Sequence, residues 1–268
     1  MSRLKIILGY ILGFIAAIIL SSLTILLIFK YTILDNNYTI HILEKNNYYE
    51  NISKEIEEKM ENYMVSSGLP ETILKDLYSE KEIKSDINIF VQNAYKGLQT
   101  ETDIENIKLR LNENIDTYIT DHNVKITSQS YIDSFVDNMA DFYKQEINLY
   151  GMLNGYIKYI PNINNGVNIT LIILLIVFAE LMVILSLLKV RFKSSVIGSG
   201  GLIILFINLI FNEKIDYQNI LIISNNFSNI IKMLIKDISS FMLSSALLLI
   251  IISTILNIVE SFIKAKSK

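Results

Sequence analysis

The sequence predicts an all-α membrane protein: four transmembrane helices, with a helical extracytoplasmic domain inserted between helices 1 and 2. Hydrophobic residues make up 51% of the 268 residues and charged residues 19%. The charged residues are missing from long blocks and crowded into others, whereas one globular domain would mix them more evenly. In the charged blocks, apolar residues recur every three or four positions, which is the helical period.

Four apolar stretches approach or exceed the roughly 20 residues that a helix needs to cross about 30 Å of hydrocarbon. They are Ile6 to Phe29, Asn168 to Leu188, Val196 to Phe211, and Phe241 to Val259. The third is the shortest, so it must cross almost straight or gain residues at its ends. The first has the charged start of a signal peptide. Its long core and the lack of a small-x-small cleavage site favour an uncleaved signal anchor.

Basic residues precede the first span, separate the second from the third, and follow the fourth. They are Arg3, Lys5, Lys189, Arg191, Lys193, Lys264, Lys266 and Lys268. An even number of spans puts all three groups on one side of the membrane, and the positive-inside rule makes that side cytoplasmic. The groups therefore fix the topology. Residues 1–30 form a cytoplasmic N-terminus followed by span one, and the C-terminal tail also faces the cytoplasm. Binding of anionic lipid headgroups is a compatible second role.

The long loop of residues 31–167 is then outside. It carries 22 acidic and 12 basic residues, a net charge of −10, which disfavours nucleic-acid binding and suits a cation or a basic partner. Residues 41–64 predict one helix, ending before Gly68 and Pro70, and a short helix follows over residues 73–78. Ser79 with Glu82, and Thr102 with Glu105, have the spacing of capping boxes that open two more helices.

A last helix of this domain begins after Ser128 or Ser130, which gives about four main helices and no clear strand, as in a small bundle. The aromatic stripes on these helices are typical of a core, and less often of a ligand pocket. The remaining segment, residues 168–268, contains spans two to four and a short outer loop, residues 212–240. Phe227 to Ile238 in that loop predict an amphipathic helix that lies on the outer membrane surface or covers the bundle.

Catalytic signals are scarce. The chain has no cysteine and two histidines, His41 and His122, neither in a metal-binding spacing. Gly198 to Gly201 lacks the lysine of a phosphate loop, and small residues there favour close helix packing. The sequence thus predicts no enzyme, no cofactor and no metal site.

Two features lie inside the spans. Small residues recur every fourth position of span one, at Gly9, Gly13, Ala17 and Ser21. Such a stripe lets another helix approach closely, either within the four-helix bundle, which we favour, or across a dimer seam.

The second feature is Glu180, near the middle of span two, where an ionisable side chain is costly. No lysine or arginine lies in any span to pair with it. Ser253 lies at a similar depth, with Asn208 and Asn257 about a turn to either side. We expect a hydrogen bond from Glu180 to Ser253 or Asn257. A proton or cation step in transport is the alternative.

The segment "YTILDNNYTIHILEKNNYYENISKEIEEKMENYMVSSGLP", with "IKSDIN" after it, resembles uncharacterised four-pass membrane proteins of low-GC Gram-positive bacteria. The resemblance implies a multi-pass protein of a bacterial plasma membrane and brings no activity. The layout of one span, a large outer domain and three spans is also similar to that of permeases of the MacB and FtsX type, but no coupling helix separates spans two and three.

Two hypotheses follow. In the first, the outer domain of a non-enzymatic membrane protein binds an envelope partner or ligand. In the second, the protein is a transport subunit that works with a separate cytoplasmic ATPase.

Overall fold

The computed structural model describes residues 3–67, 69–98, 102–125, 128–147, 159–188, 193–215 and 225–266, and all regular secondary structure in these ranges is helical. The chain divides into two compact units. We call residues 1–38 with 162–268 the membrane unit, and residues 39–161 the inserted unit.

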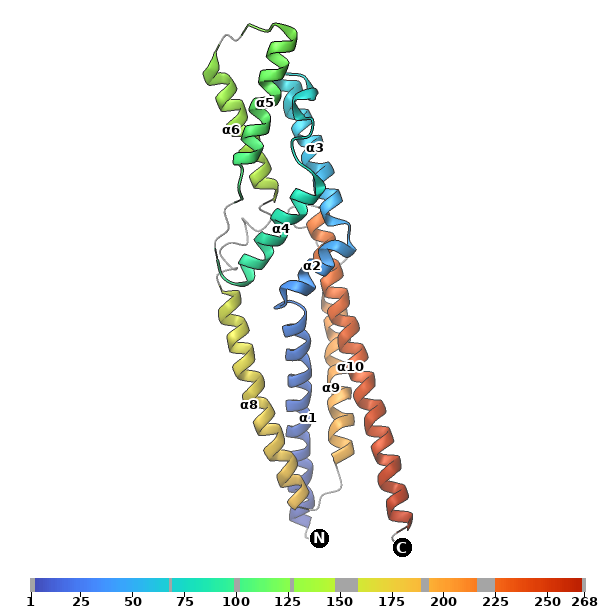
Figure 1. The fold of residues 1–268 in the computed structure, drawn as a ribbon. Helices are drawn as coiled ribbons and strands as arrows, with labels where there is room; N and C mark the ends of the chain where they lie inside the picture. Colours follow the sequence, from blue (N-terminus) through green and yellow to red (C-terminus); the bar gives the residue numbers. More distant parts are fainter. Residues whose placement is uncertain are drawn as a thin grey trace. The chain divides into compact units, whose positions relative to one another are not determined.

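The membrane unit contains α1 (Arg3–Tyr31), most of α8 (Ile160–Leu187), α9 (Lys193–Lys214) and α10 (Asn225–Lys266) (Figure 1). All four are long and apolar enough to cross a membrane, which confirms the predicted fold class. The third helix is longer than its apolar stretch. Its 22 residues extend about 33 Å at 1.5 Å per residue, so it can span without help.

The amphipathic segment before the fourth span is helical but does not form a separate surface helix. It is the first part of α10, a single helix of 42 residues. The sequence from Asn225 to Lys266 contains neither glycine nor proline, so nothing in it ends one helix and starts another. The prediction of a separate amphipathic helix before the fourth span is therefore wrong, because the segment continues into that span as one helix.

The inserted unit contains most of α2 (Asn36–Lys45), then α3 (Tyr48–Ser67), the 3-10 helix η1 (Glu71–Leu74), α4 (Glu80–Tyr95), α5 (Glu105–His122) and α6 (Gln129–Ile147). The predicted single helix over residues 41–64 is broken. Asn47 adopts a positive φ of 50°, a conformation that asparagine tolerates better than most residues, and it separates α2 from α3. The short helix predicted over residues 73–78 is the 3-10 turn η1 instead.

The two predicted capping boxes have different outcomes. At α4, the Ser79 side chain accepts a hydrogen bond from the Glu82 backbone, and the Glu82 side chain accepts one from the Ser79 backbone, so this box is confirmed. At α5, the residue before the helix is Ile104, which makes no side-chain cap. Instead, the backbone N–H of Glu105 donates to Asp103 at 3.0 Å. The aspartate lies closer to the helix start and replaces Thr102.

The apolar stripes of the inserted unit form its core. On α3, Ile52, Ile56, Met60 and Met64 are buried, and α3 packs against η1, α4 and α6. Aromatic residues of α4 and α6, including Phe90, Phe135 and Tyr143, are buried as well. The interpretation of these stripes as core is therefore confirmed.

Candidate functional site

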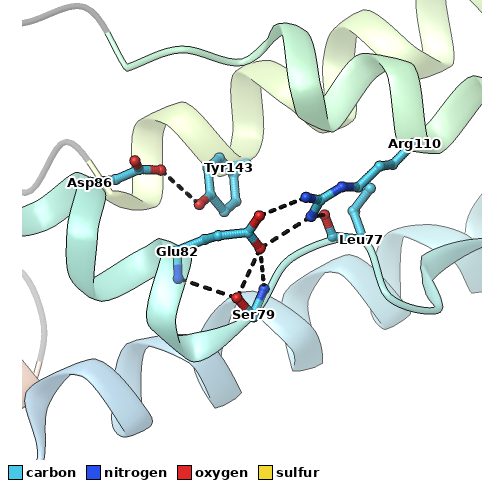
Figure 2. Close-up of polar contacts among 6 residues, drawn as sticks. All are labelled: Leu77, Ser79, Glu82, Asp86, Arg110 and Tyr143. Carbon is cyan, nitrogen blue, oxygen red and sulfur yellow. Dashed lines mark hydrogen bonds and ion pairs between the residues drawn. The ribbon is translucent and has the colours of Figure 1, made fainter.

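A polar network ties α4 to α5 at the start of α4 (Figure 2). The two terminal guanidinium nitrogens of Arg110 donate to the carboxylate of Glu82, Nη2 at 2.6 Å and Nη1 at 3.1 Å, and Nη1 also donates to the Leu77 carbonyl at 2.9 Å. The same carboxylate accepts from the backbone N–H and the hydroxyl of Ser79. These hydrogen bonds, the Arg110 pair first among them, lower the pKa of Glu82 to about 2.

A second pair lies beside the first and ties α4 to α6. The hydroxyl of Tyr143 donates to Asp86 at 3.0 Å (Figure 2). Burial raises the pKa of Asp86. Burial and the neighbouring Asp86 also raise the pKa of Tyr143. These groups hold α4, α5 and α6 together.

The inserted unit has a pocket between α5 and α6, with a volume of about 160 Å³. Its lining is mainly apolar and aromatic, with one lysine and one serine: Leu69, Ile115, Tyr118, Ile119, Val124, Lys125, Ser128, Tyr131, Ile132 and Phe135. Tyr131 is 55% exposed, so an aromatic residue that lines this pocket is also accessible to solvent. A ligand pocket was the less favoured interpretation of the aromatic stripes. Its location was not predicted, because its walls come from segments up to 66 residues apart, and their contact cannot be deduced from periodicity.

Neither histidine belongs to a metal-type cluster in the part of the chain that the structure describes. His122 stacks on the ring of Tyr118, with the ring centroids 4.4 Å apart, and its Nδ1 lies 3.1 Å from the Tyr118 carbonyl. Glu44, which lies three residues after His41, forms an ion pair with Lys84 at 2.8 Å. Within the described ranges, no group of three or more His, Asp or Glu side chains could hold a metal ion.

The polar candidates in the membrane unit form two contacts between α9 and α10. Ser253 donates to the carbonyl of Ser194 at 2.7 Å, and the Ser194 hydroxyl donates to Asn257 at 2.6 Å. Near the other end of α9, Ser239 donates to the buried Asn208 at 3.0 Å. These contacts fix the position of α9 along α10.

Glu180 takes no part in these contacts. It lies on the exposed side of α8 and makes no hydrogen bond with any residue that the structure describes. The predicted bond to Ser253 or Asn257 is therefore wrong. The helix that packs most extensively against α10 is α9, and Ser253 and Asn257 contact Ser194 of α9 instead.

The small residues of span one pack inside this chain. Gly9, Gly13, Ala17 and Ser21 are all buried in α1. Ser21 donates to the carbonyl of Gly200 on α9 at 2.9 Å, and a Cβ on Gly13 would lie 3.6 Å from Val196. The stripe therefore forms the α1–α9 contact of the bundle, as we favoured, and not a seam between subunits.

The three basic groups belong to one end of the membrane unit. Arg3 and Lys5 lie at the start of α1, Lys193 begins α9, and Lys264 and Lys266 lie in the last turn of α10. Lys189, Arg191 and Lys268 lie outside the described residues. The start of α9 contacts the N-terminal half of α1 and the C-terminal half of α10, so these helix ends lie on the same side.

These observations define an all-α, multi-pass membrane protein with a helical unit inserted between its first two spans. No protein-family model, curated protein or solved structure matches the chain. The resemblance to four-pass proteins of low-GC Gram-positive bacteria therefore stays a prediction.

Proposed function

We propose that this is a non-enzymatic protein of a bacterial plasma membrane, whose inserted unit lies outside the cytoplasm and binds an envelope polypeptide. The observation that carries the proposal is the pocket between α5 and α6. An apolar cavity of about 150 Å³ holds benzene, so a pocket of about 160 Å³ suits one aromatic or branched side chain. Interfaces often obtain most of their affinity from such an anchor in a preformed hollow.

Charge supports a basic partner. The inserted unit has 21 acidic and 12 basic residues, and complementary charge speeds the encounter between proteins. We therefore expect the bound segment to carry an apolar anchor flanked by lysine or arginine. The polar network of Glu82, Arg110, Asp86 and Tyr143 joins α4 to both helices of the pocket, and this limits their movement before binding.

The transport alternative has less support. It rested on Glu180, on the glycines that begin span three, and on the permease-like layout of the spans. Gly198 and Gly201 pack closely against α10, and Gly200 packs against α1, while Glu180 lies on the outer face of α8. We therefore rank binding first.

A photo-crosslinking amino acid at Tyr131 of the full-length protein tests the binding proposal in intact cells. We expect adducts with a discrete envelope polypeptide, reduced by raised salt and abolished when Ser128→Trp fills the pocket. The same photoprobe at Leu109, which is 58% exposed on α5 and does not line the pocket, is the matched control. Equal adducts at both positions, or none at Tyr131, would refute the proposal.

Orientation needs its own test, and the absence of cysteine in the chain makes it simple. Leu4→Cys on α1 should be shielded from an impermeant thiol reagent until the cells are permeabilised, whereas Glu58→Cys on α3 should react in intact cells. The opposite pattern would place the inserted unit in the cytoplasm.

A further inference from the structure

Helix α8 uses one face inside this chain and leaves the opposite face open. Phe178, Leu181, Met182 and Leu185 pack against α1 and the start of α9, and Leu185 is the only residue of α8 that is buried. At 100° per residue, Glu180 lies about 150° around the helix from the centre of this contact. It therefore points away from the bundle.

The open face carries a seven-residue repeat. Alternate steps of four and three residues connect Ile169, Ile173, Ile176, Glu180, Val183 and Leu187. The five apolar members of this series are each more than half exposed, and Glu180 is exposed too. This spacing keeps one seam facing a partner helix along its whole length. We call these six residues the α8 seam.

Glu180 indicates that lipid alone does not cover the seam. Lipid tails can cover isoleucine, valine and leucine, but they offer no hydrogen bond to a carboxyl group, and such a group in mid-membrane costs at least about 2.5 kcal/mol. A helix that presents a polar partner at the same depth would remove much of this cost. A single polar residue within an apolar heptad seam also fixes the register between the two helices.

We propose that the α8 seam is the interface with a second copy of this chain. Two copies with the same topology are related by a two-fold axis along the membrane normal, so their α8 helices run parallel and equal residues meet at equal depth. Glu180 then lies beside Glu180 of the other copy, where the two carboxyl groups can form a hydrogen bond with each other. A second copy satisfies Glu180 without a basic residue, and the apolar stretches of the four spans, residues 6–29, 168–188, 196–211 and 241–259, contain none. The small-residue stripe of α1 is already occupied by α9, so that stripe is not available for a contact between copies.

Single cysteines in the full-length protein test the seam, because the chain has none of its own. Under mild oxidation in native membranes, we expect Ile176→Cys to give a disulfide-linked dimer. Leu175→Cys is the matched control: it is adjacent, equally deep and 62% exposed, but lies about 100° around the helix. Equal dimer at both positions would indicate random collision and overturn the proposal. No dimer at Ile176, or a product with a different protein, would also overturn it.

Substitutions at Glu180, made in the Ile176→Cys protein, test the polar contact. Glu180→Gln keeps a donor and an acceptor at the axis and should retain the cross-linked dimer. Glu180→Leu should weaken the association about tenfold, the size expected for a hydrogen bond between membrane helices in model peptides. An unchanged dimer in the leucine variant would show that Glu180 does not help to hold the interface and would refute its assigned role.

Discussion

In the inserted unit, α3 packs against its neighbours through large side chains such as Ile56 and Met60. In the membrane unit, α9 packs against α1 and α10 through Gly200 and Gly201, and through hydrogen bonds of Ser194. The inserted unit adds ion pairs such as Arg110 with Glu82, whereas the hydrogen bonds between the described spans use serine and asparagine side chains. Both units contain apolar clusters, but the membrane unit adds close glycine contacts and uncharged hydrogen bonds where the inserted unit adds ion pairs.

The surrounding solvent explains this difference. In water, burial of large apolar side chains is the main driving force for folding. In a bilayer, lipid tails are as apolar as leucine, so burial of leucine against another helix gains little. Close backbone approach and hydrogen bonds between helices then matter more. Each prediction below separates the two kinds of packing, from the largest expected effect to the smallest.

The largest effect should come from a cavity in the inserted unit. Leu111→Ala removes a side chain that is fully buried on α5 and should lower the free energy of unfolding of this unit by about 3 kcal/mol. Leu109→Ala is the control, because it changes the same residue type two positions away, where the side chain is 58% exposed. It should change the free energy of unfolding by less than about 0.5 kcal/mol. Hydrogen exchange along α5 in the full-length protein measures both. Equal losses would show that this unit does not depend on a packed core.

In the membrane unit, adding one methyl group should be the damaging change. A Cβ on Gly201 would lie 2.8 Å from the backbone oxygen of Ala246 and 2.9 Å from Ile250. Because a backbone oxygen cannot move away as a flexible side chain can, Gly201→Ala should lower the free energy of unfolding by about 2 kcal/mol. Gly166→Ala on α8 meets nothing within 4 Å and should be neutral or slightly stabilising, because alanine favours helix.

Unfolding of the protein in mixed detergent micelles measures both glycine variants. A harmless Gly201→Ala together with a damaging Gly166→Ala would contradict the assigned packing of α9 on α10.

The sequence predicted the two kinds of packing unequally. The apolar stripes correctly predicted the core residues of α3, and the small residues predicted that another helix approaches α1 closely. Both predictions depend only on local spacing. The partner of Glu180 was predicted wrongly, since depth in the membrane does not determine which helices are neighbours. The break at Asn47 was missed because a run of polar residues between two apolar stripes does not show a left-handed turn. The pocket between α5 and α6 depends on tertiary contacts, so local patterns did not show it.

Acid should weaken the inserted unit through Glu82. Its pKa falls from 4.5 to about 2 in the folded state, so its stabilising contribution is present above pH 4.5 and is lost as the pH falls towards 2. The full shift would correspond to about 3 kcal/mol. The side chains of Glu82 and Arg110 are 43% and 35% exposed, and solvent screening reduces this to about 1 kcal/mol.

The acid prediction has a matched control. Glu82→Gln should remove this part of the pH dependence, and Glu58→Gln, an exposed carboxylate on α3, should not. Burial raises the pKa of Asp86, so the effect of Asp86 on stability has the opposite dependence on pH. The comparison therefore uses the difference in stability between each variant and the parent. Circular dichroism measures this difference from pH 5 to pH 2. Identical curves for parent and Glu82→Gln would show that the Arg110 contact contributes nothing.

The smallest effect should come from one hydrogen bond between the spans. Ser253 is buried and donates to the carbonyl of Ser194 on α9 at 2.7 Å. Ser253→Ala should cost about 0.6 kcal/mol, the average for such bonds in membranes, because the unfolded chain also finds partners there. Ser261→Ala, also on α10, is the control. Ser261 donates to the carbonyl of Asn257 on its own helix, so its loss should not affect the α9–α10 contact.

Unfolding in mixed micelles again gives both values. A loss above about 2 kcal/mol for Ser253→Ala would mean that hydrogen bonds, more than close glycine packing, hold α9 against α10, and it would reverse the order of effects expected for the membrane unit.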